Sequence, residues 1–318
     1  MNYIFVTGGV CSGMGKGILA ASVGRLLSKS GWNIIMNKYD PYLQGETEDG
    51  KSGIDSLNPE EHGEVYILPD GTCTDLDLGH YKRFTGCELN KLSSSNQGSI
   101  YQSVIKNSLS GKYGGKTCQP IPQITDEIQR RFRIGEKENT IKIIEIGGTV
   151  GDYESELFLD AIRQFKKDEN CVHIHLGLLP EISQSHEIKT KPMQHSCMAL
   201  QKAGLFPDIL VCRVSSLSDE QKDSISNKLS LFCNIKKENV IFDEDSFVYN
   251  LPYLLNKQNI TEKIYEILDI ENNGIHKIQQ AEEVATDSWF RNVDKLDIAI
   301  IGKYSRNIDA YKSVIESV

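Results

Sequence analysis

Short apolar runs alternate along this chain with longer segments in which apolar residues recur at helical spacing. The runs predict strands at residues 3–7, 33–38, 140–146, 172–178, 208–213 and 239–242. The longer segments carry apolar residues three and four positions apart and predict helices at residues 18–27, 100–108, 125–132, 156–165, 191–203, 219–232 and 260–268. Strands that alternate with helices indicate an α/β fold: a doubly wound, mainly parallel sheet with helices on both faces.

Two regions interrupt this alternation. Residues 40–61 contain three glycines, with six acidic residues from position 46 onward, and predict an exposed loop. A turn sequence at 271–274 predicts a domain end, and residues 275–292 predict a linker helix. An apolar run at 296–304 predicts one more strand, followed by helical character at 310–318. We therefore expect a first domain at residues 1–272, a linker helix at 273–294 and, at 295–318, the truncated start of a second α/β domain.

Composition narrows the classes of protein that fit. The 318 residues include 39% hydrophobic residues, enough for a substantial core, and the net charge of -9 argues against a broad basic face for nucleic acid. Eight cysteines without a C-x-x-C pair, behind an N-terminal strand in place of a signal peptide, fit a reducing cytoplasm. No apolar run approaches the roughly 20 residues of a membrane helix. We expect a cytoplasmic protein with no nucleic-acid or membrane partner.

A glycine-rich turn, Gly-Gly-Val-Cys-Ser-Gly-Met-Gly-Lys-Gly at residues 8–17, joins the first predicted strand to the first predicted helix. Backbone N–H groups and a helix N-terminus bind phosphate in such a turn, and Lys16 can reach the outer phosphates. Relative to the P-loop pattern G-x-x-x-x-G-K-[ST], Val10 replaces the first glycine and Gly17 replaces the hydroxyl residue that holds Mg²⁺. The turn predicts a nucleoside triphosphate site on a P-loop NTPase-like fold, with the metal held by carboxylates from elsewhere. The alternative is a glycine-rich turn without a ligand.

Two segments supply candidate metal ligands. In the sequence Thr-Asp-Leu-Asp-Leu at 74–78, an extended strand would place Asp75 and Asp77 on one face, where carboxylates can bind Mg²⁺. The alternative is the solvated face of an antiparallel strand. Glu145 lies at the end of the predicted strand 140–146, at the edge of the sheet where doubly wound folds bind ligands. Its alternative role is to cap a turn.

Two lysines precede another predicted helix. Lys189 and Lys191 flank Thr190, and Pro192 suits the first turn of the helix that follows. This arrangement predicts a second phosphate-binding patch, with Thr190 as the N-cap. The alternative is a solvated lysine pair.

Taken together, these segments closely resemble the CTP synthase family. The resemblance rests on residues 3–16, 38–42, 62–65, 75–84, 145–154 and 189–195, and residues 230–234 and 309–314 extend it through nearly the whole chain. It implies that ATP phosphorylates O4 of UTP and that ammonia then displaces phosphate to give CTP. Such chemistry depends on charge neutralisation by lysine and Mg²⁺. The resemblance also implies a homotetramer whose UTP site is shared between subunits, with CTP as feedback inhibitor.

The resemblance further implies roles for individual residues. Lys16 acts on the transferring phosphoryl group and Lys38 assists it, while Asp77 and Glu145 hold Mg²⁺. ATP binding falls to Gly13, Met14, Gly15, Lys16, Gly17, Ile18 and Asp77, with adenine contacts near residues 242–246. Contacts to UTP and CTP fall to Ser12, Asp152, Tyr153, Glu154, Lys189, Thr190, Lys191, Pro192, Met193, Gln194 and Lys228. Ammonia enters past Pro59, His62 and Val65.

The family's glutaminase residues would lie beyond Val318, so the resemblance predicts that this chain uses free ammonia. Two alternatives stay open. One is another ATP-dependent P-loop enzyme, such as a carboxylate-amine ligase or a dethiobiotin synthetase-like protein, which would share the glycine-rich turn but not the segments around Asp77 and Lys189. The other is an inactive nucleotide-binding paralogue that co-assembles with a full-length synthase.

Overall fold

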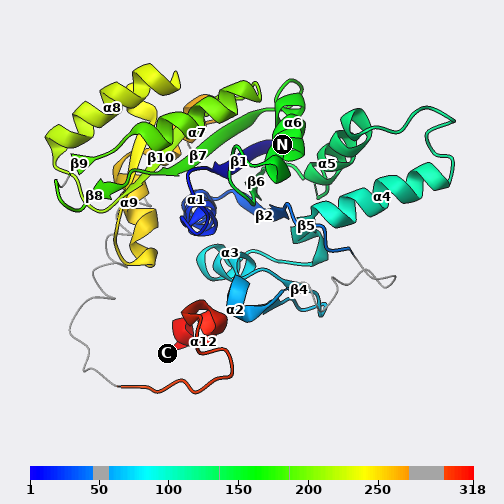
Figure 1. Ribbon diagram of the computed structural model, residues 1–318, viewed down its shortest axis with the longest axis horizontal. Helices are drawn as coiled ribbons and strands as arrows, with labels where there is room; N and C mark the ends of the chain where they lie inside the picture. Colours follow the sequence, from blue (N-terminus) through cyan, green and yellow to red (C-terminus); the bar gives the residue numbers. More distant parts are fainter. Residues whose placement is uncertain (46–56, 136, 186, 272–296) are drawn as a thin grey trace.

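Parallel strands form the central sheet of the computed structural model, which describes residues 1–45, 57–135, 137–185, 187–271 and 297–318 (Figure 1). Within these residues the sheet has seven strands in the order β11-β10-β7-β1-β6-β2-β5, and every neighbouring pair is parallel. The strands are β1 (Asn2–Gly8), β2 (Asn33–Asp40), β5 (Ser94–Asn96), β6 (Thr140–Ile146), β7 (Cys171–Leu178), β10 (Ile209–Val214) and β11 (Val240–Glu244). The predicted parallel α/β fold is confirmed.

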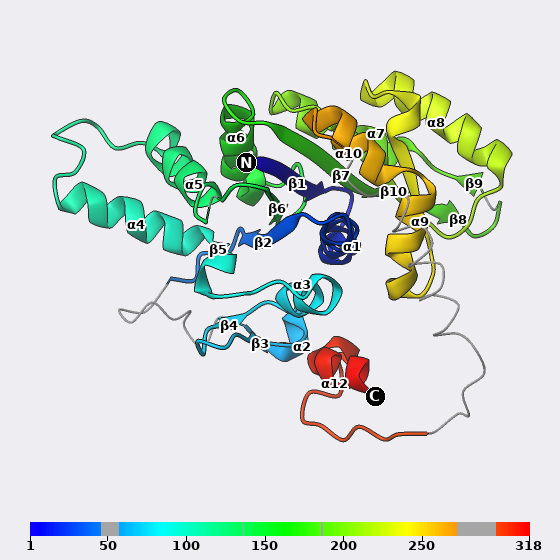
Figure 2. The same ribbon diagram turned by 180° about the vertical axis from the view of Figure 1, so that it is seen from behind.

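Alternate side chains of β1 pack on opposite faces of the sheet. Ile4 and Val6 join a core with α1 (Lys16–Lys29), α3 (Asp77–Thr85), α9 (Leu251–Lys257) and α10 (Ile260–Leu268). Tyr3 and Phe5 pack on the other face against α5 (Thr125–Phe132) and α6 (Glu156–Phe165). On that same face, α7 (Lys191–Lys202) and α8 (Asp219–Cys233) cover β10 (Figures 1 and 2). A sheet buried on both faces explains why the central strands carry apolar residues on both of their faces.

Smaller elements surround this sheet. Two antiparallel ladders pair β3 (Tyr66–Ile67) with β4 (Cys73–Thr74) and β8 (Glu181–Ile182) with β9 (Glu187–Ile188). The remaining helices are α2 (Pro59–His62), α4 (Gln97–Leu109) and α12 (Lys312–Ser317), with short turns at η2 (Lys91–Ser93), η3 (Pro120–Ile124), η4 (Tyr153–Ser155), η5 (Lys237–Asn239), η6 (Val248–Asn250) and η7 (Ile308–Tyr311). No helix in the described part of the chain is both long and apolar enough to span a bilayer.

The strand predicted through Asp75 and Asp77 is wrong. Strand β4 ends at Thr74, and helix α3 begins at Asp77. The Asp75 side chain accepts a hydrogen bond of 2.9 Å from the backbone N of Asp77, and its carbonyl accepts one of 3.2 Å from the N of Leu78. An aspartate that bonds the backbone two residues on forms a turn and leads into a helix.

The C-terminal predictions are partly wrong. Residues 297–304 form no strand, since none of the described residues pairs with them and a strand requires a hydrogen-bonded neighbour. The helical character predicted at 310–318 is present as η7 and α12. The linker helix predicted at 275–292 lies outside the described residues. So does much of the loop predicted at 40–61, although α2 forms within it because the Asn58 side chain accepts from the N of Glu60 at 3.1 Å.

Candidate functional site

The glycine-rich turn leaves the carboxyl end of β1 at the centre of the sheet. Val10, Gly13 and Gly15 have φ of 78°, 72° and 93°. Val10 thus adopts the left-handed conformation of the glycine that it replaces in the common pattern, at a cost of about 1–3 kcal/mol. Helix α1 has neither a side-chain N-cap nor an acidic residue in its first turn. Its first N–H groups and its positive end are therefore available to an anion.

Lys16 is the first residue of α1 and folds back over the turn. Its Nζ donates to the carbonyl of Gly148 at 2.8 Å, in the turn that follows β6. A Cβ on Gly8 would lie 2.7 Å from Lys16 Cδ, so a glycine there leaves room for the lysine chain. Burial lowers the pKa of Lys16, while the carboxylate of Glu145 acts in the opposite direction. The ammonium therefore lies partly desolvated between β1 and β6, where its charge acts strongly on a phosphate.

A cluster of carboxylates surrounds Lys38 at the carboxyl end of β2. Lys38 Nζ lies 2.9 Å from Asp75 Oδ1, 3.8 Å from Asp40 Oδ1 and 3.9 Å from Glu145 Oε1, and it also contacts Asp77. Burial opposes a charge on Lys38, but these carboxylates raise its pKa well above the ordinary value. Burial raises the pKa of both Asp40 and Glu145 to about 7, and Lys38 opposes this rise. One buried ammonium thus holds together several negative groups that would otherwise repel one another.

The carboxylate of Asp77 fills the space directly above Gly17. A Cβ built on Gly17 would collide with the Asp77 carboxylate and would lie 3.1 Å from its Cβ. In the common P-loop pattern this residue carries the hydroxyl that binds the metal. Here α3 brings a carboxylate to the same place, which explains why the residue after Lys16 is a glycine.

We expect Gly17→Ser, which restores the common P-loop wording, to weaken binding of a Mg²⁺–nucleoside triphosphate by roughly 10-fold, since overpacking costs about 1–3 kcal/mol. The added Cβ must displace Asp77. Calorimetric titration checks this, with Gly17→Ala as the matched variant that adds the Cβ without the hydroxyl. Both variants should lose affinity equally. Tighter binding by Gly17→Ser than by the unchanged chain would contradict the steric explanation.

The donor set fits Mg²⁺ held jointly with a phosphate. Among the residues that the structure describes, no group of three or more His, Cys, Asp or Glu side chains is arranged to hold a metal ion. Mg²⁺ commonly takes only one or two carboxylates and completes its shell with phosphate oxygens and water. Asp77 and Glu145 offer two hard oxygen ligands beside the glycine-rich turn. Tyr81 of α3 donates a hydrogen bond to Glu145 and orients its carboxylate.

Sequence reasoning missed Arg213, which lies at the end of β10. Its Nη1 donates to the carbonyl of Met14 at 2.8 Å, and its Nε donates to Asp245 Oδ1 at 3.4 Å. Arg213 and Asp245 line a hollow of about 450 Å³ beside the glycine-rich turn. Of the residues 242–246 predicted to contact adenine, Asp245 alone lines this hollow, and Phe242 is buried in the core. The position of Arg213 at a strand's carboxyl end was the available signal.

The predicted lysine patch lies at the start of α7. Lys191 is the first residue of that helix and Pro192 lies in its first turn, as predicted. Thr190 occupies the predicted N-cap position, but its side chain makes no capping bond, because its backbone angles are helical and its Oγ1 accepts from Gln194 Nε2 at 3.0 Å. Lys191 Nζ lies 5.5 Å from the ring centroid of Phe232 on α8, the helix that also carries Lys228. Residues 189–194 and Lys228 therefore come from two neighbouring helices.

Asp152, Tyr153 and Glu154 come from a different part of the chain than those lysines. They occupy the turn after β6, and Tyr153 is 84% exposed. Within the described residues no hydrogen bond or ion pair joins these three to α7 or α8. The chain thus brings Lys16, Lys38, Asp77 and Glu145 together, whereas the predicted UTP contacts come from the glycine-rich turn, the turn after β6 and the α7–α8 region.

The residues predicted for ammonia entry lie on and just after α2. The rings of Tyr42 and His62 are 5.5 Å apart, and Tyr42 follows the end of β2 that carries Lys38. Asn307 Nδ2 donates to the carbonyl of Pro59 at 3.3 Å. The backbone N of Glu64, next to Val65, donates to the carbonyl of Asp309 at 2.8 Å. The C-terminal segment with η7 and α12 therefore packs beside α2 (Figures 1 and 2).

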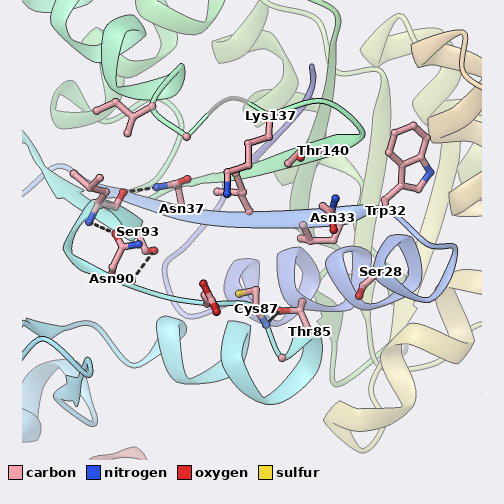
Figure 3. Close-up of a pocket in the computed structure, with 17 residues that line it drawn as sticks. Ser28, Trp32, Asn33, Asn37, Thr85, Cys87, Asn90, Ser93, Lys137 and Thr140 are labelled. Atoms are coloured by element: carbon pink, nitrogen blue, oxygen red, sulfur yellow. Dashed lines mark hydrogen bonds between the residues drawn. The ribbon is translucent and has the colours of Figure 1, made fainter.

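A hollow of about 570 Å³ lies at the opposite end of the strands and contains none of the predicted site residues. Figure 3 shows Asn33 and Asn37 of β2 lining it, with Trp32, Lys137 and Thr140 nearby. It exists because β5 pairs only with Lys38–Asp40 and leaves the first part of β2 without a neighbour on that side. Its position separates it from the phosphate-binding turn.

The sequence of the chain matches known proteins of a single family. A family model described as CTP synthase N-terminus matches residues 2–270. The chain is 45% identical over 324 residues to CTP synthase of Protochlamydia amoebophila, which covers 99% of this chain and 57% of that protein. It is 45% identical over 322 residues to CTP synthase of Methanococcus maripaludis, covering 100% and 58%. The chain thus spans somewhat more than half the length of these curated relatives.

Proposed function

The chain belongs to the CTP synthase family, and we propose that it catalyses the ATP-dependent amination of UTP to CTP. The observation that carries the proposal is the Asp77 carboxylate above Gly17, beside Lys38 and Glu145. In this proposal, Asp77 provides the metal ligand for the glycine-rich turn, because Gly17 lacks the hydroxyl that serves this purpose in the common pattern. Mg²⁺ bound by Asp77 and Glu145 would neutralise phosphate charge.

The proposed reaction has two steps. Uracil O4 of UTP bonds to the γ-phosphorus of ATP as N3 loses its proton to solvent, the bond from the phosphorus to the bridging oxygen breaks and ADP leaves. Ammonia then adds to C4, loses a proton and expels inorganic phosphate, which leaves CTP. Residues 13–18 hold the ATP phosphates, while the ammonium groups of Lys16 and Lys38 stabilise the charge on the transferring group. Adenosine takes the hollow beside Arg213 and Asp245.

The pyrimidine nucleotide is held by two sets of residues. Ser12 in the glycine-rich turn, residues 189–194 and Lys228 hold one part of UTP. Asp152, Tyr153 and Glu154 hold another part in a neighbouring subunit of a homotetramer. The 84% exposure of Tyr153, which leaves its side chain open to a second subunit, supports a shared site. CTP carries the same ribose and triphosphate as UTP, so these lysines also bind it as feedback inhibitor.

Ammonia reaches the phosphorylated uracil past Pro59, His62 and Val65. The contact between His62 and Tyr42 supports this route, because Tyr42 is close in sequence to Asp40 and Lys38. Residues 1–272 act as the synthetase domain in this proposal, and 295–318 belong to the start of a glutaminase domain. The nucleophile in the synthetase site is ammonia.

The proposal is tested by incubating the full chain with UTP, ATP, Mg²⁺ and an ammonium salt. We expect CTP, ADP and phosphate in equal amounts by chromatography, and no CTP when the ammonium salt is left out. Calorimetry with UTP and with an ATP analogue runs in parallel. Binding of both nucleotides without any CTP would reject the activity and favour the inactive paralogue.

A further inference from the structure

A chain of buried hydrogen bonds runs beneath the glycine-rich turn. Thr7 Oγ1 lies 2.8 Å from His173 Nε2 and 2.9 Å from His175 Nδ1. His175 Nε2 in turn lies 2.8 Å from Ser196 Oγ. Thr7 is in β1, the histidines are in β7, and Ser196 is in α7, with exposed fractions of 1%, 0%, 0% and 6% in chain order. The network therefore links the strand before the turn to the helix that carries the predicted UTP contacts.

Ser196 also supports the turn sterically. A Cβ on Gly9 would collide with Ser196 Oγ, and it would lie 2.7 Å from Ser196 Cβ and 3.2 Å from His175 Nε2. The backbone N of Gly9 donates to the carbonyl of Leu176 on β7 at 3.0 Å. The first residue of the turn after β1 is thus held between β7 and the hydroxyl of α7. Only a glycine allows so close an approach.

The imidazole of His175 is neutral, and both of its ring nitrogens are hydrogen-bonded. Burial lowers the pKa of His175 to about 3, and the nearby Lys16 acts in the same direction. A neutral imidazole has one donor and one acceptor nitrogen, so His175 must donate to one of its partners and accept from the other. Removal of the Ser196 hydroxyl would leave the buried His175 Nε2 without its hydrogen-bond partner. It would also remove the atom that packs against Gly9.

We propose that Ser196 and His175 are positioning residues that hold the glycine-rich turn and the start of α7 at one fixed separation. The inference rests on the proposed function, in which the turn binds ATP and the start of α7 binds UTP. Ser196 lies two positions after Gln194 on the same helix, so a shift of Ser196 moves both. In-line phosphoryl transfer depends on this separation, because a misplacement of about 1 Å costs roughly 100-fold in rate.

The kinetic test compares Ser196→Ala with Ser30→Ala in the full chain. Ser30 is also buried, and its Oγ donates to the carbonyl of Leu26 at 3.0 Å, so each variant loses one buried hydroxyl bond. We expect Ser196→Ala to lower kcat by about 10-fold or more while KM for ATP and UTP changes by less than about 3-fold. Ser30→Ala should leave kcat unchanged. Equal kcat in the two variants would overturn the proposal.

A second pair of variants covers the case in which Ser196→Ala folds poorly. Thr7→Val removes the hydroxyl at the other end of the network at nearly constant volume, and Thr7→Ser keeps it. We expect Thr7→Val to lower kcat and Thr7→Ser to leave kcat unchanged. A loss of the same size in both would assign the effect to packing and reject the positioning role.

Hydrogen exchange separates this inference from the proposed function. ATP added without UTP should slow amide exchange in the glycine-rich turn and in peptides covering residues 191–202. In the Ser196→Ala variant, ATP should still slow amide exchange in the glycine-rich turn but should no longer slow it in α7. If the unchanged chain makes no CTP but transmits this protection, the proposed function fails and the positioning role stands. Equal protection of α7 in both proteins would overturn the positioning role.

Discussion

Lys16→Ala is expected to lower the rate of CTP formation by about 1,000-fold, equivalent to about 4 kcal/mol of transition-state stabilisation. The ammonium lies partly buried between β1 and β6 and donates to the neutral carbonyl of Gly148. Its charge is therefore available to the transferring phosphoryl group, in surroundings where water screens it weakly. Single-turnover formation of CTP from saturating UTP and ATP measures the effect.

Lys29→Ala is the control for this change. Lys29 lies in the last turn of the same helix and is exposed, so the variant removes an equal charge at the far end of α1. It should turn over at the unchanged rate. A loss of less than about 10-fold in a folded Lys16→Ala chain would show that Lys16 does not contact the transferring group.

Asp77→Asn is expected to lower kcat by about 100-fold or more and to raise the Mg²⁺ concentration needed for half-maximal rate by about 10-fold. An asparagine keeps the shape above Gly17 but removes the charge that would bind the metal. Titration of the rate against Mg²⁺ at saturating nucleotides measures both effects.

Asp75→Asn separates the metal role from the electrostatic one. Asp75 also contacts Lys38, with Oδ1 2.9 Å from the Lys38 Nζ, but the same Asp75 oxygen also accepts a hydrogen bond from the backbone N of Asp77. The three atoms nearest to a Cβ built on Gly17 all belong to Asp77 and none to Asp75. We expect this variant to change the Mg²⁺ requirement by less than about 3-fold. Equal Mg²⁺ shifts in the two variants would assign the effect to the charge around Lys38 instead of a metal ligand.

Much of the fold was predictable because its signals are local. The helices at 125–132, 156–165 and 260–268 and the strand at 140–146 match the structure residue for residue. Their apolar periodicity is clear, and burial of the sheet on both faces makes its strands stand out from the polar segments around them. The strand predicted at 296–304 failed for the opposite reason, since a strand needs a partner that a local pattern cannot supply.

The candidate site was predictable in part. The missing hydroxyl at Gly17 indicated that a carboxylate from elsewhere would serve the turn, and Asp77 lies there. The alternation argument that first selected Asp77 was nevertheless wrong, because the side chain of Asp75 ends the strand and starts α3. Asp245 fell within the segment 242–246 predicted to contact adenine, but Arg213 was not selected, since an arginine at a strand end has many uses until its neighbours are known.

The order of residues along the chain was sufficient for the parallel α/β architecture and the glycine-rich turn between strand and helix, and it pointed to a carboxylate from elsewhere beside Gly17. Each of these features follows from interactions within about ten residues, or from the absence at Gly17 of the hydroxyl that the common P-loop pattern carries there. The carboxylate cluster around Lys38 and the network from Thr7 to Ser196 depend instead on the folded sheet. Thr7 meets His175 because β1 and β7 pair in that register, and no local pattern encodes a contact between residues 168 positions apart.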